Sequence, residues 1–589
     1  MARNRYDIDE VLETPFDFSH FKRSFKYMRK YRGKMILALV LSIFAALSGL
    51  LGPIITKYAL DNTVPAKKVG ELWLLGGLLL LTFAVSVVFS TIRARIMTVV
   101  GQDMIFDIRS DLFAHLQELP FSYYDDRPHG KILIRVVNYV NSVSDMLSNG
   151  VISVILEFLN MIFITVFMFL VDVKLSLIVL AGIPLFMFVM FSIKKYQRRA
   201  WQDVSNKSSN LNAYLQENIV GARVTQIFTR EEENAGIFDR LSNKYRKSWM
   251  RAVGFSNLVW PATDNISTMI RAAIFLFGLL IMTPASVTLG TIAAMTGYAS
   301  RFWQPIMNLS NLFNNFINNI AYLERIFETL DEPVTIADKE GANEIGEIRG
   351  DVSFKNVTFA YEEGVNVLEN VSFDVKAGES IALVGPTGAG KSTIVSLISR
   401  FYDVTGGKIT IDGRDISGVT LRSLRSQMGI MLQDSFIFSG TIADNIRYGR
   451  LDAKPDEIRE ASKVVCAHDF ISEMEDGYDT EVNERGSKLS GGQKQLISFA
   501  RTLLSDPKIL VLDEATSSID AKTERLLQQG LNELLKGRTS FIIAHRLSTI
   551  KNCDRIMYID HKGITECGSH DELMAKKGDY YKLYTSQML

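Results

Sequence analysis

Long uncharged apolar stretches in the first half of the chain set the strongest limit on its fold. Each holds about twenty residues or more, the length that a helix needs to cross the roughly 30 Å hydrocarbon core of a bilayer. Transmembrane helices are therefore expected near residues 35–60, 72–100, 146–171, 174–195, 254–282 and 289–318. No apolar stretch of that length follows residue 320. The sequence predicts an all-α bundle of six membrane helices, followed by a domain outside the membrane.

Basic residues crowd the segment just before the first apolar stretch. They are Lys22, Arg23, Lys26, Arg29, Lys30, Arg32 and Lys34. Segments rich in Lys and Arg stay on the cytosolic side of a membrane, and an even number of spans returns the chain to the side where it started. We therefore expect a multi-pass protein of the cytoplasmic membrane with both termini in the cytosol. Phenylalanines among these cations favour a helix in the membrane interface, and no cleavable signal peptide is expected.

The connections between the predicted spans differ strongly in length. Those on the outer side are short, whereas the inner ones, Arg93–Asp145 and Lys194–Val253, are each more than 50 residues long and rich in charge. Half of such a connection, folded as helix, reaches on the order of 35–40 Å. Both are therefore predicted to be helical extensions that lead to another domain, with tips near Asp126–Leu133 and Gln216–Gly221.

A few charged residues lie within the predicted spans. They are Glu157, Asp264, Arg271 and Arg301. Each costs about 2.5–3.5 kcal/mol at the centre of a membrane helix, so these side chains are expected to face a cavity or lie near an end. They could line a translocation path or pair between helices. Asp264 and Arg271 are two turns apart, and no direct ion pair is expected between them. Glu157 and Arg271 are the candidate residues of a cargo path, with Glu157 the better candidate for cargo contact.

A glycine-rich loop marks a nucleotide site in the second half of the chain. It lies between two apolar runs, Ile381–Val384 and Ile394–Ile398, which gives the order strand, loop, helix that cradles phosphates. The glycines let backbone N–H groups point inward, and the helix directs its positive end at the anion. Lys391 is placed to reach the β- and γ-phosphates, and the Ser392 hydroxyl to bind Mg²⁺. We call this segment the phosphate loop: Gly385, Pro386, Thr387, Gly388, Ala389, Gly390, Lys391, Ser392 and Thr393.

The sequence around this loop alternates strand and helix patterns. Strands are expected at Val352–Phe359, Ile381–Val384, Lys408–Ile411, Ile430–Leu432, Ile509–Leu512 and Ser540–Ala544, and helices at 455–473 and 494–505. This alternation predicts an α/β domain with a largely parallel sheet.

A second glycine-rich loop opens the helix near residue 494. It consists of Leu489, Ser490, Gly491, Gly492 and Gln493, and forms another anion site at a helix N-terminus. One nucleotide does not need two such cradles. We therefore expect this loop to face a nucleotide held by another chain, in a head-to-tail dimer with two enclosed ATP molecules.

With the run that ends in Asp513 and Glu514, these motifs resemble those of an ATP-binding cassette (ABC) nucleotide-binding domain. The whole chain is similar to a bacterial half-transporter of the multidrug and lipid exporter type, over about residues 16–585. The resemblance implies a type IV exporter fold that joins the membrane bundle to a P-loop ATPase domain. The expected divisions are 1–33 for a cytosolic N-terminal segment that forms the elbow, 34–320 for the membrane domain, 321–350 for a linker and 351–589 for the ATPase.

The resemblance also implies roles for residues around the nucleotide. Tyr361 would stack on adenine, Gln433 would sense Mg²⁺ and the γ-phosphate, and Asp513 would help to hold Mg²⁺ together with Ser392. ATP and Mg²⁺ are the cofactors that these residues imply.

Further roles concern hydrolysis and the partner chain. Glu514 would polarise the attacking water as general base, and His545 would contact the γ-phosphate and that water. Asp520 would cross the dimer interface. The second glycine-rich loop would be the signature that contacts the partner's ATP through Ser490 and Gly492. The two cytosolic tips would be coupling helices that dock on the ATPase domains.

Composition limits the partners. The net charge is +0, so nothing in the charge balance favours nucleic acid, and three separated cysteines give neither a metal motif nor a disulfide framework. The expected function is ATP-driven export of amphipathic small molecules by alternating access, with membrane lipid and a second half-transporter, identical or paralogous, as partners. Alternatives are a lipid flippase, a peptide or siderophore transporter, and a membrane ATPase that regulates another protein.

Overall fold

The computed structural model describes residues 19–125, 127, 129–281, 287–362, 364–431, 435–483, 486–514, 521–544 and 547–588. The chain divides into two compact units. The first comprises Met1–Gln117 and Pro128–Glu332, and the second comprises Glu118–Arg127 and Pro333–Leu589. A short segment between two helices of the membrane half thus groups with the ATPase half.

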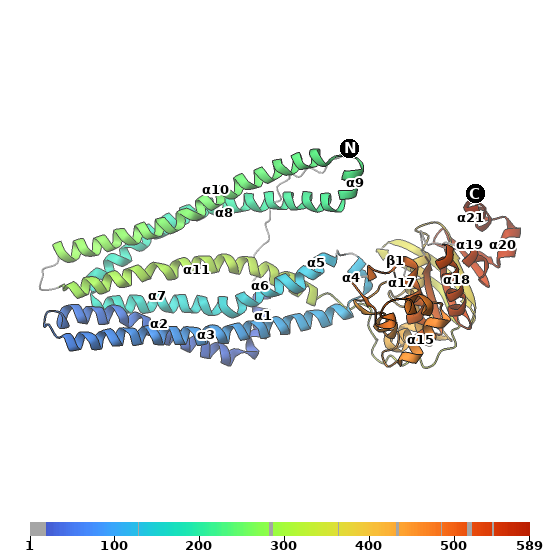
Figure 1. Ribbon diagram of the computed structural model, residues 1–589, viewed down its shortest axis with the longest axis horizontal. Coiled ribbons are helices and arrows are strands. Elements are labelled where there is room, and N and C mark those ends of the chain that lie inside the picture. Colours follow the sequence, from blue (N-terminus) through green and yellow to red (C-terminus); the bar gives the residue numbers. More distant parts are fainter. Residues whose placement is uncertain are drawn as a thin grey trace. The chain divides into compact units, whose positions relative to one another are not determined.

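The first unit is built of long helices (Figure 1). Its main helices are α1 (Ser19–Lys30), α2 (Arg32–Tyr58), α3 (Val69–Glu118), α7 (Val151–Val171), α8 (Val173–Val220), α10 (Glu231–Leu276) and α11 (Leu289–Leu330). Short segments connect them: η1 (Ala59–Thr63), α5 (His129–Ile134), η2 (Arg135–Tyr139), α6 (Val140–Asp145), η3 (Met146–Gly150), α9 (Ala222–Ile227) and η4 (Phe277–Ile281). The helices cover every predicted span, and α3, α8, α10 and α11 extend well beyond the apolar stretches. The all-α membrane bundle is confirmed.

Four helical stretches within the described residues are long and apolar enough to cross a membrane. They are Arg32–Thr63, Val69–Glu118, Gly130–Val171 and Val173–Val220. Helix α10 with η4, and helix α11, occupy the ranges expected for the fifth and sixth spans but are more polar. In α11 the polarity is concentrated on one face, described below.

Helices α8 and α10 run alongside each other to α9, which joins them (Figure 1). The Tyr214 hydroxyl donates to the Asn234 carbonyl at 3.0 Å, and the Trp201 indole donates to the Ser256 hydroxyl at 3.1 Å. The predicted helical extension is therefore present. Its tip is α9 rather than Gln216–Gly221, because α8 continues to Val220 and only Gly221, with φ −84° and ψ 9°, interrupts it.

The tip of the other extension also differs from its predicted position. Helix α4 (Phe121–Asp125) precedes the expected range 126–133, and α5 fills most of that range. Pro120 lies immediately before α4. Proline cannot continue a preceding helix, because it lacks a backbone N–H, but it is well placed at a helix start. Asp126 and Pro128 lie outside the described residues.

Close packing at Gly182 joins α8, α10 and α11. A Cβ atom at Gly182 would lie 2.3 Å from Ile270 Cδ1 and 3.3 Å from the Trp303 ring. We expect Gly182→Ala to destabilise the membrane unit by about 1–3 kcal/mol, the usual cost of overpacking, seen as a lower unfolding temperature in detergent. Gly254→Ala, at an open position on α10, is the matched control.

The double variant Gly182→Ala/Ile270→Val should recover part of the stability, since it removes the clashing methyl group. Equal unfolding temperatures for Gly182→Ala and the native protein would contradict this packing.

The second unit contains two main sheets. One has the strand order β12-β11-β3-β10-β9-β6 and is parallel except for the β11–β12 pair. Its strands are β3 (Ser380–Val384), β6 (Met428–Met431), β9 (Ile509–Glu514), β10 (Thr539–Ala544), β11 (Arg555–Asp560) and β12 (Gly563–Gly568). The predicted parallel sheet is confirmed for its central strands.

The other sheet is antiparallel, with the order β2-β1-β4-β5. It is formed by β1 (Val352–Glu362), β2 (Val365–Val375), β4 (Gly406–Ile411) and β5 (Arg414–Asp415). Placing Val352–Phe359 and Lys408–Ile411 in the parallel sheet was wrong. Burial explains the difference: β1 mixes buried and exposed positions, as antiparallel strands often do, whereas β3 is almost continuously buried.

Helices surround the parallel sheet (Figure 1). They are α12 (Lys391–Ile398), α13 (Leu421–Arg425), α14 (Ile442–Arg447), α15 (Pro455–Val464), α16 (His468–Ser472), α17 (Gly491–Leu504), α18 (Ala521–Leu535), α19 (Leu547–Lys551), α20 (His570–Lys576) and α21 (Asp579–Met588). The single helix predicted at 455–473 is two helices, because the backbone at Cys466 turns left-handed, with φ 60°. A two-stranded ribbon pairs β7 (Gly440–Thr441) with β8 (Glu481–Val482).

Candidate functional site

The carboxyl ends of four adjacent strands define one edge of the parallel sheet. Leu383 of β3 pairs with Ile543 of β10, and Ile543 pairs with Asp513 of β9. On the other side of β9, Leu512 pairs with Met431 of β6. Ligands of open parallel sheets bind at this edge. The phosphate loop follows β3 directly, and Glu514 ends β9.

Three predicted site residues lie outside the described residues. Gln433 comes soon after β6, His545 comes directly after β10, and Asp520 precedes α18. Their predicted roles remain predictions.

Glycine is required in the phosphate loop. Gly385, Gly388 and Gly390 have φ values of 145°, 82° and 101°, a region that side chains rarely allow. At Gly385 a Cβ atom would also lie 2.2 Å from the Ile559 carbonyl oxygen. The loop ends at Gly390, the residue before α12, so the positive end of α12 opens onto the loop.

Lys391 holds the loop together. Its side chain is only 8% exposed, and its ammonium donates to the carbonyls of Gly385 at 2.9 Å and Pro386 at 2.8 Å. Burial lowers the pKa of this ammonium, and the charge of Asp513 opposes that effect. Lys391 follows β3 and Asp513 lies in β9, at the same edge of the sheet, which is the arrangement that a phosphate and Mg²⁺ site requires.

Mg²⁺ prefers oxygen ligands, and the residues present offer them. The Ser392 side chain is exposed at the start of α12, and Asp513 is half-buried at the end of β9. A hydroxyl and a carboxylate beside a phosphate cradle fit this ion. Glu514 completes β9 as the next residue, and its side chain lies outside what the structure describes.

Tyr361 offers an aromatic surface near the loop. It lies in β1 and is 50% exposed, and its hydroxyl lies 3.1 Å from the Thr393 hydroxyl of the phosphate loop. Its ring contacts Phe359 and Tyr402, with centroids 4.8 and 5.1 Å away. An exposed ring beside a phosphate cradle is suited to stacking a nucleotide base.

The second glycine-rich loop caps α17. The Ser490 hydroxyl accepts from the Gln493 N–H at 3.2 Å, and the Gln493 side chain accepts from the Ser490 N–H at 2.9 Å. This capping box satisfies two backbone N–H groups at the start of α17. Ser490 and Gly491 are exposed, whereas Leu489 and Gly492 are buried. Gly486, three residues before this loop, is left-handed, with φ 60°.

In the membrane unit, Glu157 is bonded to α11. The Asn308 amide donates to the Glu157 carboxylate at 2.7 Å, and the Gln304 amide donates to the Asn308 oxygen at 3.0 Å. Gln304, Asn308, Asn311 and Asn315 follow one another at helical spacing, so they share one face of α11. Asn308 is half-buried and the other three are exposed. The asparagine-rich stretch was the sequence signal for this face, which sequence reasoning missed.

Arg271 makes the ion pair that was not expected. Its guanidinium lies 3.9 Å from the Asp264 carboxylate and also donates to the hydroxyls of Thr268 at 2.7 Å and Ser300 at 3.3 Å. The prediction failed because a long helical side chain points toward the N-terminus of its helix. Arginine can thus span most of the two turns back to Asp264.

Arg301 has a structural partner. Its guanidinium donates to the Gly49 carbonyl of α2 at 2.6 Å. That carbonyl has no helical donor, because the residue four positions later is Pro53, which lacks an N–H. A neighbouring helix thus satisfies the backbone group that proline leaves unpaired.

Comparisons with known proteins agree with this geometry. The family model for the ABC transporter transmembrane region matches residues 35–306, and the ABC transporter family model matches residues 368–517. The chain is 41% identical to YknV, an ABC transporter ATP-binding protein of Bacillus subtilis, over 100% of this chain and 98% of YknV. It is 35% identical to an ATP-dependent lipid A-core flippase of Syntrophus aciditrophicus, over 96% of this chain and 94% of the flippase.

A solved structure has the same fold throughout. It is a bacterial Atm1-family ABC exporter with ATP bound, which superposes with a TM-score of 0.79 and 28% identity. The match covers 95% of this chain and 98% of that exporter.

Proposed function

The chain belongs to the ABC transporter family, as an exporter half that joins a membrane region to an ATPase domain, and from this premise we propose that it exports amphipathic small molecules, drug-like or lipid-like, across the cytoplasmic membrane. The cytosolic position of both termini is part of the proposal. The observation that carries it is the polar face of α11 with Glu157, in a unit that contains four strongly apolar helical stretches. Such a face is stable in a membrane where it lines a water-filled path.

The nucleotide chemistry follows from the sheet edge. The phosphate loop and Lys391 bind the phosphates, and Tyr361 stacks the base. Ser392 and Asp513, with Gln433, would hold Mg²⁺, which neutralises phosphate charge. Glu514 then orients and deprotonates the attacking water, and His545 supports it. Loss of the γ-phosphate contacts reopens the pair of ATPase domains.

The partner is proposed to be a second copy of this chain. The chain retains both the proposed base Glu514 and the complete signature Leu489–Gln493, so two copies would form two complete sites. In this pair Asp520 would lie at the interface. ATP would favour the closed pair, and the coupling helices α4 and α9 would carry that change to the membrane helices. Apolar side chains exposed around α9 fit such docking: Ile219, Val220, Val224, Ile227 and Phe228.

Glu157 and Arg271 are proposed to line the cargo path. Arg271 has Asp264 as an ionic partner, whereas the Glu157 carboxylate is held by the neutral amide of Asn308. Among the described residues, Glu157 therefore has an amide partner and no ionic one, which favours cargo with a cationic head. We expect Glu157→Gln to reduce ATP-dependent uptake of a cationic amphiphilic dye into inside-out vesicles by about tenfold, since charge-assisted hydrogen bonds contribute about 1.5–3 kcal/mol.

The same vesicles separate the alternatives. Glu71→Gln is the matched control, because Glu71, in the first turn of α3, pairs with Lys68 and is not assigned to the cargo path. ATP-dependent movement of a fluorescent phospholipid between leaflets, without dye uptake, would favour the lipid flippase that one relative's name suggests. ATP hydrolysis with neither activity would contradict the transport proposal.

A further inference from the structure

The segment Arg400–Tyr402 follows closely after α12 and begins with an unusual backbone conformation. Helix α12 begins at Lys391 in the phosphate loop and ends at Ile398. Arg400 follows with φ 48°, a left-handed conformation that costs energy for any residue except glycine. Such strain persists only where the surroundings hold the backbone firmly. The segment Arg400–Tyr402 is therefore a fixed point attached to the helix that starts at the phosphates.

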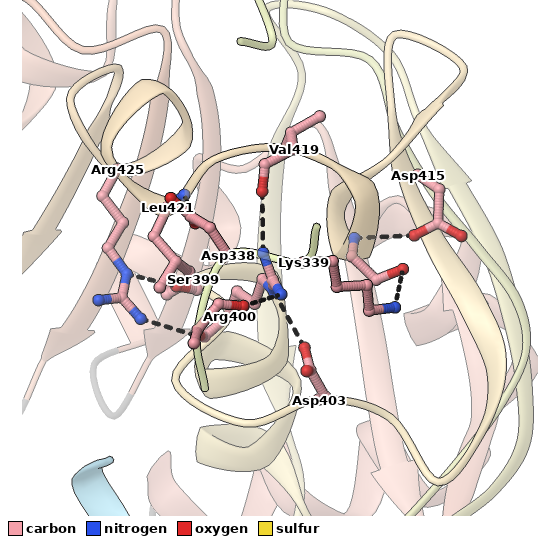
Figure 2. Close-up of polar contacts among 11 residues, drawn as sticks. Asp338, Lys339, Ser399, Arg400, Asp403, Asp415, Val419, Leu421 and Arg425 are labelled. Atoms are coloured by element: carbon pink, nitrogen blue, oxygen red, sulfur yellow. Dashed lines mark hydrogen bonds and ion pairs between the residues drawn. The ribbon is translucent and has the colours of Figure 1, made fainter. Parts of the chain in front are cut away.

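Arg400 supplies much of this fixation (Figure 2). Its side chain is 1% exposed. Its guanidinium donates to the Asp403 carboxylate at 3.0 Å, the Val419 carbonyl at 3.0 Å and the Ala337 carbonyl at 3.1 Å. Ala337 belongs to the segment that enters the ATPase unit from the membrane half.

A second arginine holds the backbone itself (Figure 2). Arg425 donates to the carbonyls of Arg400 at 2.7 Å and Ser399 at 3.3 Å, and its guanidinium lies over the Phe401 ring at 5.1 Å. Burial, with the nearby charge of Arg400, lowers the pKa of Arg425. The two arginines together leave Phe401 and Tyr402 in defined positions.

Phe401 and Tyr402 contact α4. The Phe401 and Phe121 rings are 4.7 Å apart, and the Tyr402 hydroxyl donates to the Asp125 carboxylate at 2.9 Å. Helix α4 lies in Glu118–Arg127, the segment between two membrane-unit helices that belongs to the ATPase unit. Phe401 and Tyr402 therefore contact a segment that α3 precedes and α5 follows in the sequence.

The ring of Tyr402 also contacts Tyr361, the residue proposed to stack on the nucleotide base. It packs edge-to-face on Tyr361 at 5.1 Å and 88°, and on Phe359 at 5.7 Å and 65°. Tyr402 thus touches Tyr361 with its ring and Asp125 with its hydroxyl.

We propose that Tyr402 is a positioning residue that couples occupancy of the base site at Tyr361 to helix α4. The inference rests on the proposed role of Tyr361. A nucleotide base that stacks on Tyr361 would restrict the motion of that ring and of the Tyr402 ring packed against it. The hydrogen bond from the Tyr402 hydroxyl to Asp125 would then restrict the motion of α4. Coupling is reciprocal, so a displacement of α4 also changes affinity for the base. The nucleotide base, rather than the phosphates, is proposed to act on this contact, because only the base would touch the Tyr361 ring.

Hydrogen exchange on the full-length protein in lipid nanodiscs tests the coupling. ADP and pyrophosphate are the probes, since neither supplies the γ-phosphate that closes the pair. At concentrations that protect residues 385–393 equally, we expect ADP to slow exchange in 121–125 by roughly fivefold or more, the lower range of typical couplings. Pyrophosphate should leave 121–125 unchanged.

Tyr402→Phe keeps the ring and removes the hydroxyl. It should abolish the effect of ADP on 121–125 while ADP still protects 385–393, and Asp125→Ala should do the same. Tyr478→Phe removes a different tyrosine hydroxyl bond, that to His468, and should behave like the native protein.

The outcomes separate the coupling from the nucleotide site. Equal protection of α4 by pyrophosphate, or an unchanged ADP effect in Tyr402→Phe, overturns the coupling alone. If ADP fails to protect residues 385–393 in the native protein, the proposed nucleotide site fails, and the coupling with it.

Discussion

Glu514→Gln is expected to reduce ATP hydrolysis by about 10²–10⁴-fold, the range that a general base contributes, while ATP still binds. The amide keeps the shape of the side chain but cannot accept a proton from water. The residues that bind ATP, centred on Lys391 and the glycines of the phosphate loop, are unchanged. Phosphate release from the purified protein measures turnover, and binding of a fluorescent ATP analogue measures affinity.

An exposed carboxylate provides the control for this substitution. Glu473→Gln, in the segment after α16, removes a carboxylate of the same kind away from the sheet edge and should leave hydrolysis unchanged. Substantial remaining hydrolysis in Glu514→Gln would refute its assignment as base.

Mixed dimers are expected to show activity only when one complete composite site remains. In a head-to-tail pair, each site combines the phosphate loop of one copy with the signature of the other. A Lys391→Ala copy paired with a Ser490→Arg copy keeps one intact site, built from the unaltered loop of one chain and the unaltered signature of the other. A copy carrying both substitutions, paired with a native copy, keeps none.

The two mixtures contain the same substitutions, so overall damage to folding cannot separate them. Two affinity tags isolate each mixed pair, and ATP hydrolysis is measured. Activity in the first pair and its near-absence in the second is the expected result. Equal activities would contradict the head-to-tail arrangement, and a failure of two tagged copies to co-purify would point to a different partner chain.

The shape of the phosphate loop could be predicted because it depends on local sequence. The glycines at 385, 388 and 390 are needed for the shape of one short loop, and that loop sits between two apolar runs that can only be a buried strand and a buried helix start. The structure shows positive φ values at these three glycines, and α17 begins at the second glycine-rich loop, where a helix start was expected. Spacing along the chain carried this information.

Features that depend on contacts between distant segments were not predictable. The bond between Tyr402 and Asp125 joins residues 277 positions apart, and nothing in either local sequence indicates it. The antiparallel sheet was missed because strand patterns do not reveal which strands pair. The Arg271–Asp264 pair was rejected on spacing alone, which ignores how far and in which direction an arginine side chain extends.

The bond between Arg301 and Gly49 has a consequence for biosynthesis. The first span is made early with a backbone oxygen that Pro53 leaves without a donor, and the donor is 252 residues away, in the last membrane helix. Until residue 301 has been synthesised, the guanidinium that bonds the Gly49 carbonyl is absent, and this carbonyl needs another donor, such as water. Packing of α11 against α2 is therefore the step that gives this backbone oxygen its donor within the protein.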